Sequence, residues 1–349
     1  MNQLSQRDAQ RIARHAAAAD IAGFLHPVQQ ALLHRRGWLT MLAPRAAGGT
    51  ELSLPQVVRL EQAVAAVDGS MGWVLTLCAG AGWFAGFLSP ALARQIIGTP
   101  RACLAGSGAP TGYADEDGDG YRITGRWDYA SGAPMATHFT LNAVLRVNGQ
   151  PLLDAQGAPR IRAFLVPAAL VQVEDNWRSI GMRASASHSY RIDNAWVSKD
   201  HGFTISPDTA TADGPLYRFP FYSLAYVTLA ANVAGMASHF IELARECTHR
   251  RNKGMALLEE KEQNLQAARA GFHAVLDRSW AQIAAGGTLT DEDMLAIQTR
   301  SLTLVATARA AVNDLYPYCG LYAAHQDSPI NRVWRDFHTA SQHSLLLPA

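Results

Sequence analysis

An excess of charge of either sign is absent from this chain of 349 residues. Its 30 Lys and Arg side chains nearly balance its 29 Asp and Glu side chains. Nucleic acids and anionic membrane surfaces attract proteins through an excess of basic charge. We therefore expect neither nucleic acid nor a membrane as a partner.

Cysteine is also scarce, and the sequence contains no CxxC pair. Disulfide frameworks and structural zinc sites need closely grouped thiols. The four cysteines are far apart in the chain and suggest neither: Cys78, Cys103, Cys247 and Cys319.

Neither a secretory signal nor a membrane span is expected. The first 20 residues place charges among their apolar positions, unlike a signal peptide. The longest apolar stretch, Met71 to Leu88, approaches the length of a membrane span, but it is rich in small residues and lacks closely flanking basic residues. It favours a buried core helix, and we expect a soluble, cytoplasmic protein.

Three regions of different composition follow one another. Residues 1–100 are Ala-rich with helical periodicity, and residues 101–205 contain short alternating runs separated by turn residues. Residues 206–349 begin with a Pro- and Gly-rich linker and continue as long helical segments. The expected order is a helical domain, an antiparallel β-domain and a four-helix bundle with helices near 221–250, 255–284, 290–316 and 328–346.

The first candidate motif is the glycine cluster from Gly106 to Gly112. A nicotinamide-binding loop requires a helix directly after its glycines, but the acidic turn from Asp115 to Gly120 follows here. Two interpretations stay open. The cluster is a plain hairpin connection, or it is a bare loop whose backbone lies against a flat heterocycle.

Two further motifs lie in predicted strands. Alternation places Trp127, Tyr129 and Ser131 on one face, either as a stacking surface with a hydroxyl or as a well-packed strand. Alternation also places Arg183 with Ser185 and Ser187, facing either a phosphate or sugar, or solvent. The neighbouring His188 is expected to be structural.

The fourth motif lies near the C-terminus. At about 100° per residue, Arg332, Asp336, Thr339 and His343 fall on one stripe of a predicted helix. A histidine on such a stripe either serves as a general acid or base or joins an interhelical polar network.

Taken in order, four segments resemble the acyl-CoA dehydrogenase superfamily. They are AAGGTELSLPQVVRLEQAVAAVDGSMGWVL, GYRITGRWDYASG, NWRSIGMRASASHSYRIDNAWV and SPINRVWRDFHTASQH. The nearer match is the flavin-dependent monooxygenase branch, with two-component phenol and steroid hydroxylases and the dibenzothiophene monooxygenase. The resemblance covers nearly the whole chain and implies an α+β fold that is mostly α. Its parts are an N-terminal helical domain, a middle antiparallel β-barrel and a C-terminal four-helix bundle.

The resemblance also implies the residues that hold and serve a flavin, either FMN or FAD. Residues of the β-domain would bind it: Ala105, Gly106 and Ser107 at the pyrimidine edge, Tyr129 beside the ring, Ser131 at the N5/O4 edge, and Trp177 and Ser187. Arg250 or Arg251 matches an arginine that reaches a neighbouring subunit's flavin in a homotetramer. The catalytic candidates are His343, Ser131 and Asp336.

Two departures separate the chain from relatives. The C-terminal region from Tyr316 to His343 contains no Glu, whereas acyl-CoA dehydrogenases commonly place their catalytic glutamate there. Ala81 stands where several hydroxylases carry a histidine, which leaves His343 as the acid or base on the substrate side.

Three functions follow from the resemblance. The leading hypothesis is a two-component monooxygenase that uses O2, reduced flavin from a separate reductase and a small apolar or aromatic substrate. The second is an acyl-CoA dehydrogenase with its base near Glu242 or Glu246. The third is a catalytically inactive ligand-binding member.

Overall fold

The computed structural model describes residues 3–347, which begin with a layer of five helices. Polar residues define the starts of these helices: the Ser5 hydroxyl accepts from the Asp8 N–H, and the Asp68 carboxylate accepts from the Met71 N–H. The helices are α1 (Gln6–Ala22), α2 (Pro27–Arg35), α3 (Leu54–Ala65), α4 (Gly69–Trp83) and α5 (Pro90–Ile97).

The middle region is one mixed sheet in the order β7-β8-β3-β2-β4-β6-β9, with β1 and β5 also paired to β4. Its longer strands alternate buried and exposed residues, as expected when one face is covered. The strands are β1 (Leu104–Gly106), β2 (Gly112–Asp117), β3 (Gly120–Ala130), β4 (His138–Val147), β5 (Gln150–Pro151), β6 (Ile161–Pro167), β7 (Gln172–Glu174), β8 (His188–Ser198) and β9 (Gly202–Phe203).

Long helices form the C-terminal region. After the short α6 (Pro215–Arg218) come α7 (Phe221–Arg251), α8 (Met255–Ala284), α9 (Asp291–Cys319), α10 (Leu321–Ala324) and α11 (Pro329–Ala340). The capping box of Thr290 and Asp293 starts α9. α7 packs against α8, α9 and α11, so these four helices form the predicted bundle.

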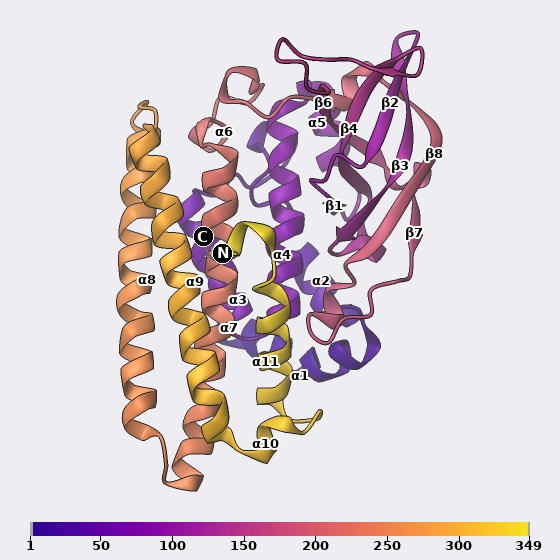
Figure 1. Ribbon diagram of the computed structural model, residues 1–349. Coiled ribbons are helices and arrows are strands. Elements are labelled where there is room, and N and C mark those ends of the chain that lie inside the picture. Colours follow the sequence, from indigo (N-terminus) through magenta and orange to yellow (C-terminus); the bar gives the residue numbers. More distant parts are fainter. Residues whose placement is uncertain (1–2, 348–349) are drawn as a thin grey trace.

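Helix α4 lies between the bundle and the sheet (Figure 1) and packs against α7, α11 and β1. Two regions, Gly69–Phe87 and Phe221–Arg251, are long and apolar enough to cross a membrane, but 83% and 78% of their tested windows are buried. Their burial agrees with the core-helix interpretation of the apolar stretch. The buried apolar residues of both helical regions form one cluster, and most of the buried sheet residues form a second.

Three details differ from the sequence-based expectation. β4 runs parallel to β1 and β2, so the sheet is mixed and not wholly antiparallel. Within residues 3–347 no pairing joins the edge strands β7 and β9, so the sheet does not close into a barrel. The last helix ends at Ala340, because Ser341 and the residues after it leave the helical path.

Candidate functional site

Trp73 and Ser131 meet where α4 faces the end of β3. The Trp73 indole N–H donates to the Ser131 hydroxyl over 3.1 Å, and both side chains are buried. One turn along α4, the Cys78 thiol donates to the Ser131 carbonyl over 3.5 Å. The Gly132 N–H donates to the Ser185 carbonyl over 2.8 Å. Backbone and side-chain contacts thus hold Ser131 between α4 and the segment around residue 185.

Three serine hydroxyls continue the contact from Ser131. The Ser131 and Ser187 oxygens are 2.8 Å apart, the Ser187 and Ser185 oxygens are 2.7 Å apart, and the Ser185 hydroxyl donates to the Met182 carbonyl over 2.7 Å. All three serines are buried. Ser185 belongs to a 3-10 turn, Arg183–Ser185, and not to a strand. The predicted strand alternation was therefore wrong, although Ser185 and Ser187 do meet.

Trp127, Tyr129 and Ser131 do not share one face. The pairing of β3 with β8 is irregular between Trp127 and Ala130, and Tyr129 adopts a φ of 67°. The irregularity reverses the alternation, because an extra residue turns the following side chain to the other side. Trp127 is fully buried and stacks on Tyr190, whereas Tyr129 is 71% exposed. A bulky residue at positive φ is unusual, and such strain is concentrated at functional sites.

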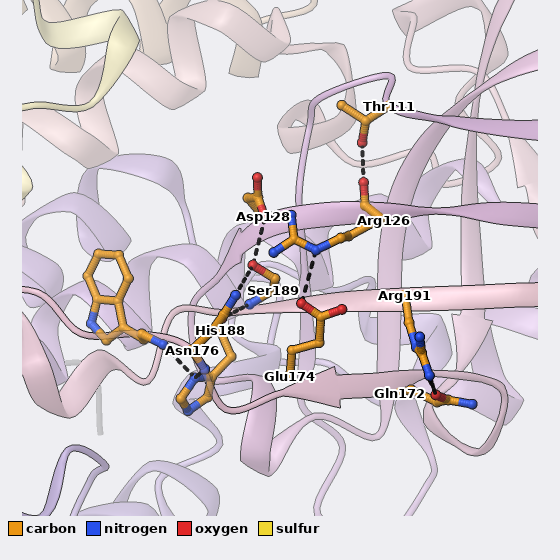
Figure 2. A network of polar contacts seen from close by, with 10 residues as sticks. Thr111, Arg126, Asp128, Gln172, Glu174, Asn176, His188, Ser189 and Arg191 are labelled. Atoms are coloured by element: carbon orange, nitrogen blue, oxygen red, sulfur yellow. Dashed lines mark hydrogen bonds and ion pairs between the residues drawn. The ribbon is translucent and has the colours of Figure 1, made fainter.

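Trp177 lies edge-on to Tyr129, with ring centroids 6.1 Å apart, and its indole N–H donates to the Met182 carbonyl. The turn before it is anchored to β8. The His188 Nδ1 accepts from the backbone N–H groups of Asn176 and Trp177. The Asn176 side chain exchanges two hydrogen bonds with Ser189 (Figure 2). His188 thus has the expected structural part in positioning Trp177.

The loop from Ala105 to Ser107 is tied to β4. The Ser107 N–H donates to the Thr140 carbonyl over 3.1 Å, and the Tyr190 hydroxyl donates to the same oxygen over 2.7 Å. β1 and β2 pair with β4 and not with one another in the described chain, so the glycine cluster is not a hairpin connection. A Cβ at Gly108 would meet no atom within 4 Å, which leaves this loop open on one side.

His343 lies beyond α11 and caps the following turn, Ser344–Leu346. The prediction that it shares a helix face with Asp336 was therefore wrong. Its Nδ1 accepts from the Leu345 N–H over 3.3 Å, and its ring lies edge-on to Trp73 at 5.9 Å. Burial lowers the pKa of His343 below its usual value. The ring is therefore neutral at pH 7, with its proton on Nε2.

Asp336 is buried and anchors the segment that carries Trp177 and Ser187. Its carboxylate accepts from the Met182 N–H over 2.5 Å. The adjacent Arg335 donates to the Ile180 carbonyl and pairs with the buried Asp20 at 2.7 Å. Burial, followed by the nearby Asp68 charge, raises the pKa of Asp336 to about 7. This geometry assigns Asp336 an anchoring part, and its oxygen contacts a backbone amide.

Arg250 and Arg251 end α7, far along the bundle from the serines. Arg250 lies over the Tyr322 ring at 5.1 Å and is 3.8 Å from Glu246. Within this protomer neither arginine joins the site. Their predicted part concerns a neighbouring subunit and stays a prediction.

Sequence reasoning missed Trp73 and the anchor at Met182. Trp73 stood in the quoted GWVL run, but helical periodicity could not separate it from core residues, since it is itself 92% buried. Met182 acts through its backbone at a positive φ of 54°, and residue type gives no sequence signal for that role.

Comparisons with known proteins show which families the chain resembles. The model of the acyl-CoA dehydrogenase C-terminal domain matches residues 227–348. Across 338 residues the chain is 28% identical to a pigment production hydroxylase from Rhodococcus sp. (strain ATCC 21145), covering 89% of this chain and 83% of the relative. These matches show that the chain is similar to proteins of the acyl-CoA dehydrogenase superfamily. Its recognition as similar to the flavin-dependent monooxygenase branch is confirmed.

Solved structures confirm the fold. The HsaA monooxygenase from M. tuberculosis has a TM-score of 0.90 at 22% identity, covering 97% of this chain and 93% of that one. XiaF from Streptomyces sp., in complex with FADH2 and glycerol, has a TM-score of 0.87 at 23% identity, covering 97% and 89%. FMN-bound TdsC from Paenibacillus sp. A11-2 has a TM-score of 0.81 at 21% identity, covering 97% and 92%. Structures with this fold therefore accommodate either flavin.

Proposed function

We propose that this protein belongs to the acyl-CoA dehydrogenase superfamily and is the oxygenase component of a two-component flavin-dependent monooxygenase. Reduced FMN or FAD from a separate reductase, together with O2, would serve to insert one oxygen atom into a small apolar or aromatic substrate. The bound flavin supplies the oxygen chemistry, and the protein positions it and excludes water. We propose a soluble, cytoplasmic homo-oligomer.

The observation that carries this proposal is a neutral histidine at the serine cluster without a carboxylate base beside it. His343 contacts Trp73, and Trp73 donates to Ser131. Asp336 is committed to the Met182 amide. An α-proton cannot be removed from an acyl-CoA without a base, so this arrangement favours oxygen chemistry over desaturation.

The alternative base of an acyl-CoA dehydrogenase is also badly placed. Glu242 and Glu246 lie on the exposed side of α7. At 1.5 Å per residue they are roughly 30 Å or more along that helix from Tyr222. Glu246 is paired with Arg250. Neither carboxylate supports the desaturase hypothesis within one protomer.

The residues present fit a flat flavin ring. Tyr129 is exposed, Trp177 lies edge-on to it, and the loop at Gly108 is open. Ser131 directly follows β3, two residues after Tyr129. Aromatic edges and a loop without side chains suit a planar heterocycle. We assign Ala105–Ser107, Tyr129, Ser131 and Trp177 to flavin contact.

A groove of about 570 Å³ supports the substrate class. It lies between β4 and the first turns of α7 and α9, and the Asn142 side chain links it to the Gly108 carbonyl. Its apolar lining is Ile205, Phe221, Tyr222, Met294 and Leu295, and no Lys or Arg is among its described lining residues. Such a groove suits a neutral aromatic molecule and lacks the cations that bind the phosphates of coenzyme A.

The hydrogen bond to Nδ1 determines which nitrogen of the neutral His343 ring carries the proton. Because Nδ1 accepts from the Leu345 amide, Nε2 carries a hydrogen and donates. Acting as a base through Nε2 would require the other tautomer and the loss of that cap. We therefore assign His343 as a hydrogen-bond donor near the reacting atoms.

The test mixes the purified protein with chemically reduced FMN or FAD, air and a panel of phenols and indoles. Oxygenated product detected by mass spectrometry supports the proposal. Without oxygen, bleaching of bound oxidised flavin by an acyl-CoA would instead establish the desaturase. Failure to bind flavin in either redox state at micromolar concentration would refute the proposal and favour the inactive ligand-binding alternative.

A further inference from the structure

The serine cluster has a defined hydrogen-bond direction. A serine hydroxyl has one proton and two acceptor positions. Ser185 donates its proton to the Met182 carbonyl, so it can only accept from Ser187. Ser187 has then used its own proton and must accept from Ser131.

The indole of Trp73 defines the other end. Its N–H is a donor only, and it points at the Ser131 oxygen. Ser131 therefore accepts from Trp73, donates to Ser187 and keeps one acceptor position. The donation runs from Trp73 through Ser131, Ser187 and Ser185 to the carbonyl of Met182.

This direction of hydrogen-bond donation is stable because all four side chains are buried and the Met182 carbonyl, the last acceptor, is held in place. The relative exposures are 8% for Trp73, 4% for Ser131, 5% for Ser187 and 0% for Ser185. The Met182 carbonyl also accepts from the Trp177 indole, and the Met182 N–H is held by Asp336. Reversing the chain would break the 2.7 Å hydrogen bond from the Ser185 hydroxyl to the Met182 carbonyl and leave the buried Ser131 proton without an acceptor, which is costly in a buried site.

We propose that this one-way serine chain makes Ser131 a hydrogen-bond acceptor toward the flavin, with Ser185 and Ser187 as positioning residues that select reduced over oxidised flavin. Reduced flavin carries a hydrogen at N5 and donates there, whereas oxidised flavin presents only a lone pair at N5. Ser131 has an acceptor position for the first and no proton for the second. The inference rests on the proposed flavin binding at Ser131.

Ser185 is the residue at which the direction is set. In Ser185→Ala the Ser187 proton loses its acceptor and turns toward Ser131, whose own proton is then free to face the ligand. Ser185→Thr keeps the hydroxyl and should keep the direction. Ser301→Ala is the matched control, because Ser301 is a buried serine of α9 whose hydroxyl has no partner among the described residues.

The experiment measures the dissociation constants of oxidised FMN and of dithionite-reduced FMN, the latter without oxygen, for the wild type and the three variants. The wild type should bind the reduced form more tightly. In Ser185→Ala the dissociation constant for oxidised FMN divided by that for reduced FMN should fall by about tenfold, which corresponds to the free energy of one hydrogen bond. That change lowers the midpoint potential of the bound flavin by about 30 mV for a two-electron couple. Ser185→Thr and Ser301→Ala should retain the wild-type ratio.

Each other outcome overturns a defined statement. If the wild type binds neither form, the proposed function fails and the inference fails with it. If the wild type binds reduced flavin tightly and Ser185→Ala keeps the same ratio, the serine chain does not set the selectivity and only the inference fails. An equal loss of affinity for both forms also refutes the inference, because it would show that Ser185 supports the site by packing and does not orient the hydroxyl protons.

Discussion

The buried Asp336 carboxylate predicts a stability that declines as pH rises. Burial and the Asp68 charge raise the pKa of Asp336 from 3.8 to about 7 in the folded protein. A carboxyl group with a raised folded pKa holds its proton in the native state after the unfolded chain has released it. Stability from this group is therefore complete below about pH 4 and is lost as pH rises toward 7.

The magnitude follows from the size of the shift. One pKa unit corresponds to about 1.4 kcal/mol, so the full loss is about 4 kcal/mol, of which about 3 kcal/mol falls between pH 5 and pH 8. Asp336→Asn removes the titration and keeps an oxygen that accepts from the Met182 N–H. The variant should become more stable relative to the wild type as pH rises from 5 to 7, and the difference should level off above pH 7.

Urea unfolding at half-unit pH steps measures the difference in unfolding free energy between Asp336→Asn and the wild type. Asp208→Asn, an exposed aspartate, is the control and should show no such trend. Asp68→Asn keeps a side chain that caps α4 but removes a neighbouring charge, so it should move the decline to lower pH. If this difference in unfolding free energy is constant from pH 5 to 8, or changes in the opposite direction, the Asp336 carboxyl is not protonated in the folded protein. The fold would then stabilise its charged form.

Three further predictions concern single side chains. His343→Ala should lower the product formed per O2 consumed by at least about tenfold and release hydrogen peroxide, while exposed His325→Ala should not; unchanged coupling would remove His343 from the chemistry. Tyr129→Gly should raise stability by about 1 kcal/mol by relieving the positive φ, and should weaken reduced-flavin binding about fivefold. Tighter binding in calorimetry would contradict its contact with the ring. Glu61 is fully buried in α3, neither of its oxygens has a partner among the described residues, and burial raises its pKa. Stability is therefore lost as pH rises and the buried carboxyl ionises. Glu61→Leu should stabilise the protein at pH 8 by about 1 to 3 kcal/mol, measured by urea unfolding. A destabilised variant would show that Glu61 has a stabilising partner.

Local patterns predicted the order of elements, and four segments in order carried the resemblance to the acyl-CoA dehydrogenase superfamily. Helical periodicity, turn residues and caps act over a few residues, so α7, α8 and α9 were expected within a few residues of their observed bounds. The missing Glu between Tyr316 and His343 and the small residues after Gly106 are also readable directly. The missing Glu argued against acyl-CoA dehydrogenation, and the flavin was an implication of the resemblance.

Tertiary structure alone decided how the site is assembled. The irregularity after Trp127 reversed Tyr129 relative to its strand neighbours, because the pairing with β8 and not the alternation determines the face. The end of α11 at Ala340 separated His343 from Asp336, and packing against Met182 made Asp336 an anchor. The chain from Trp73 to Ser185 spans more than 100 residues of sequence and ends on a backbone carbonyl. Residue type encodes no partner for a backbone oxygen, so the direction of those hydroxyl protons is a property of the folded protein.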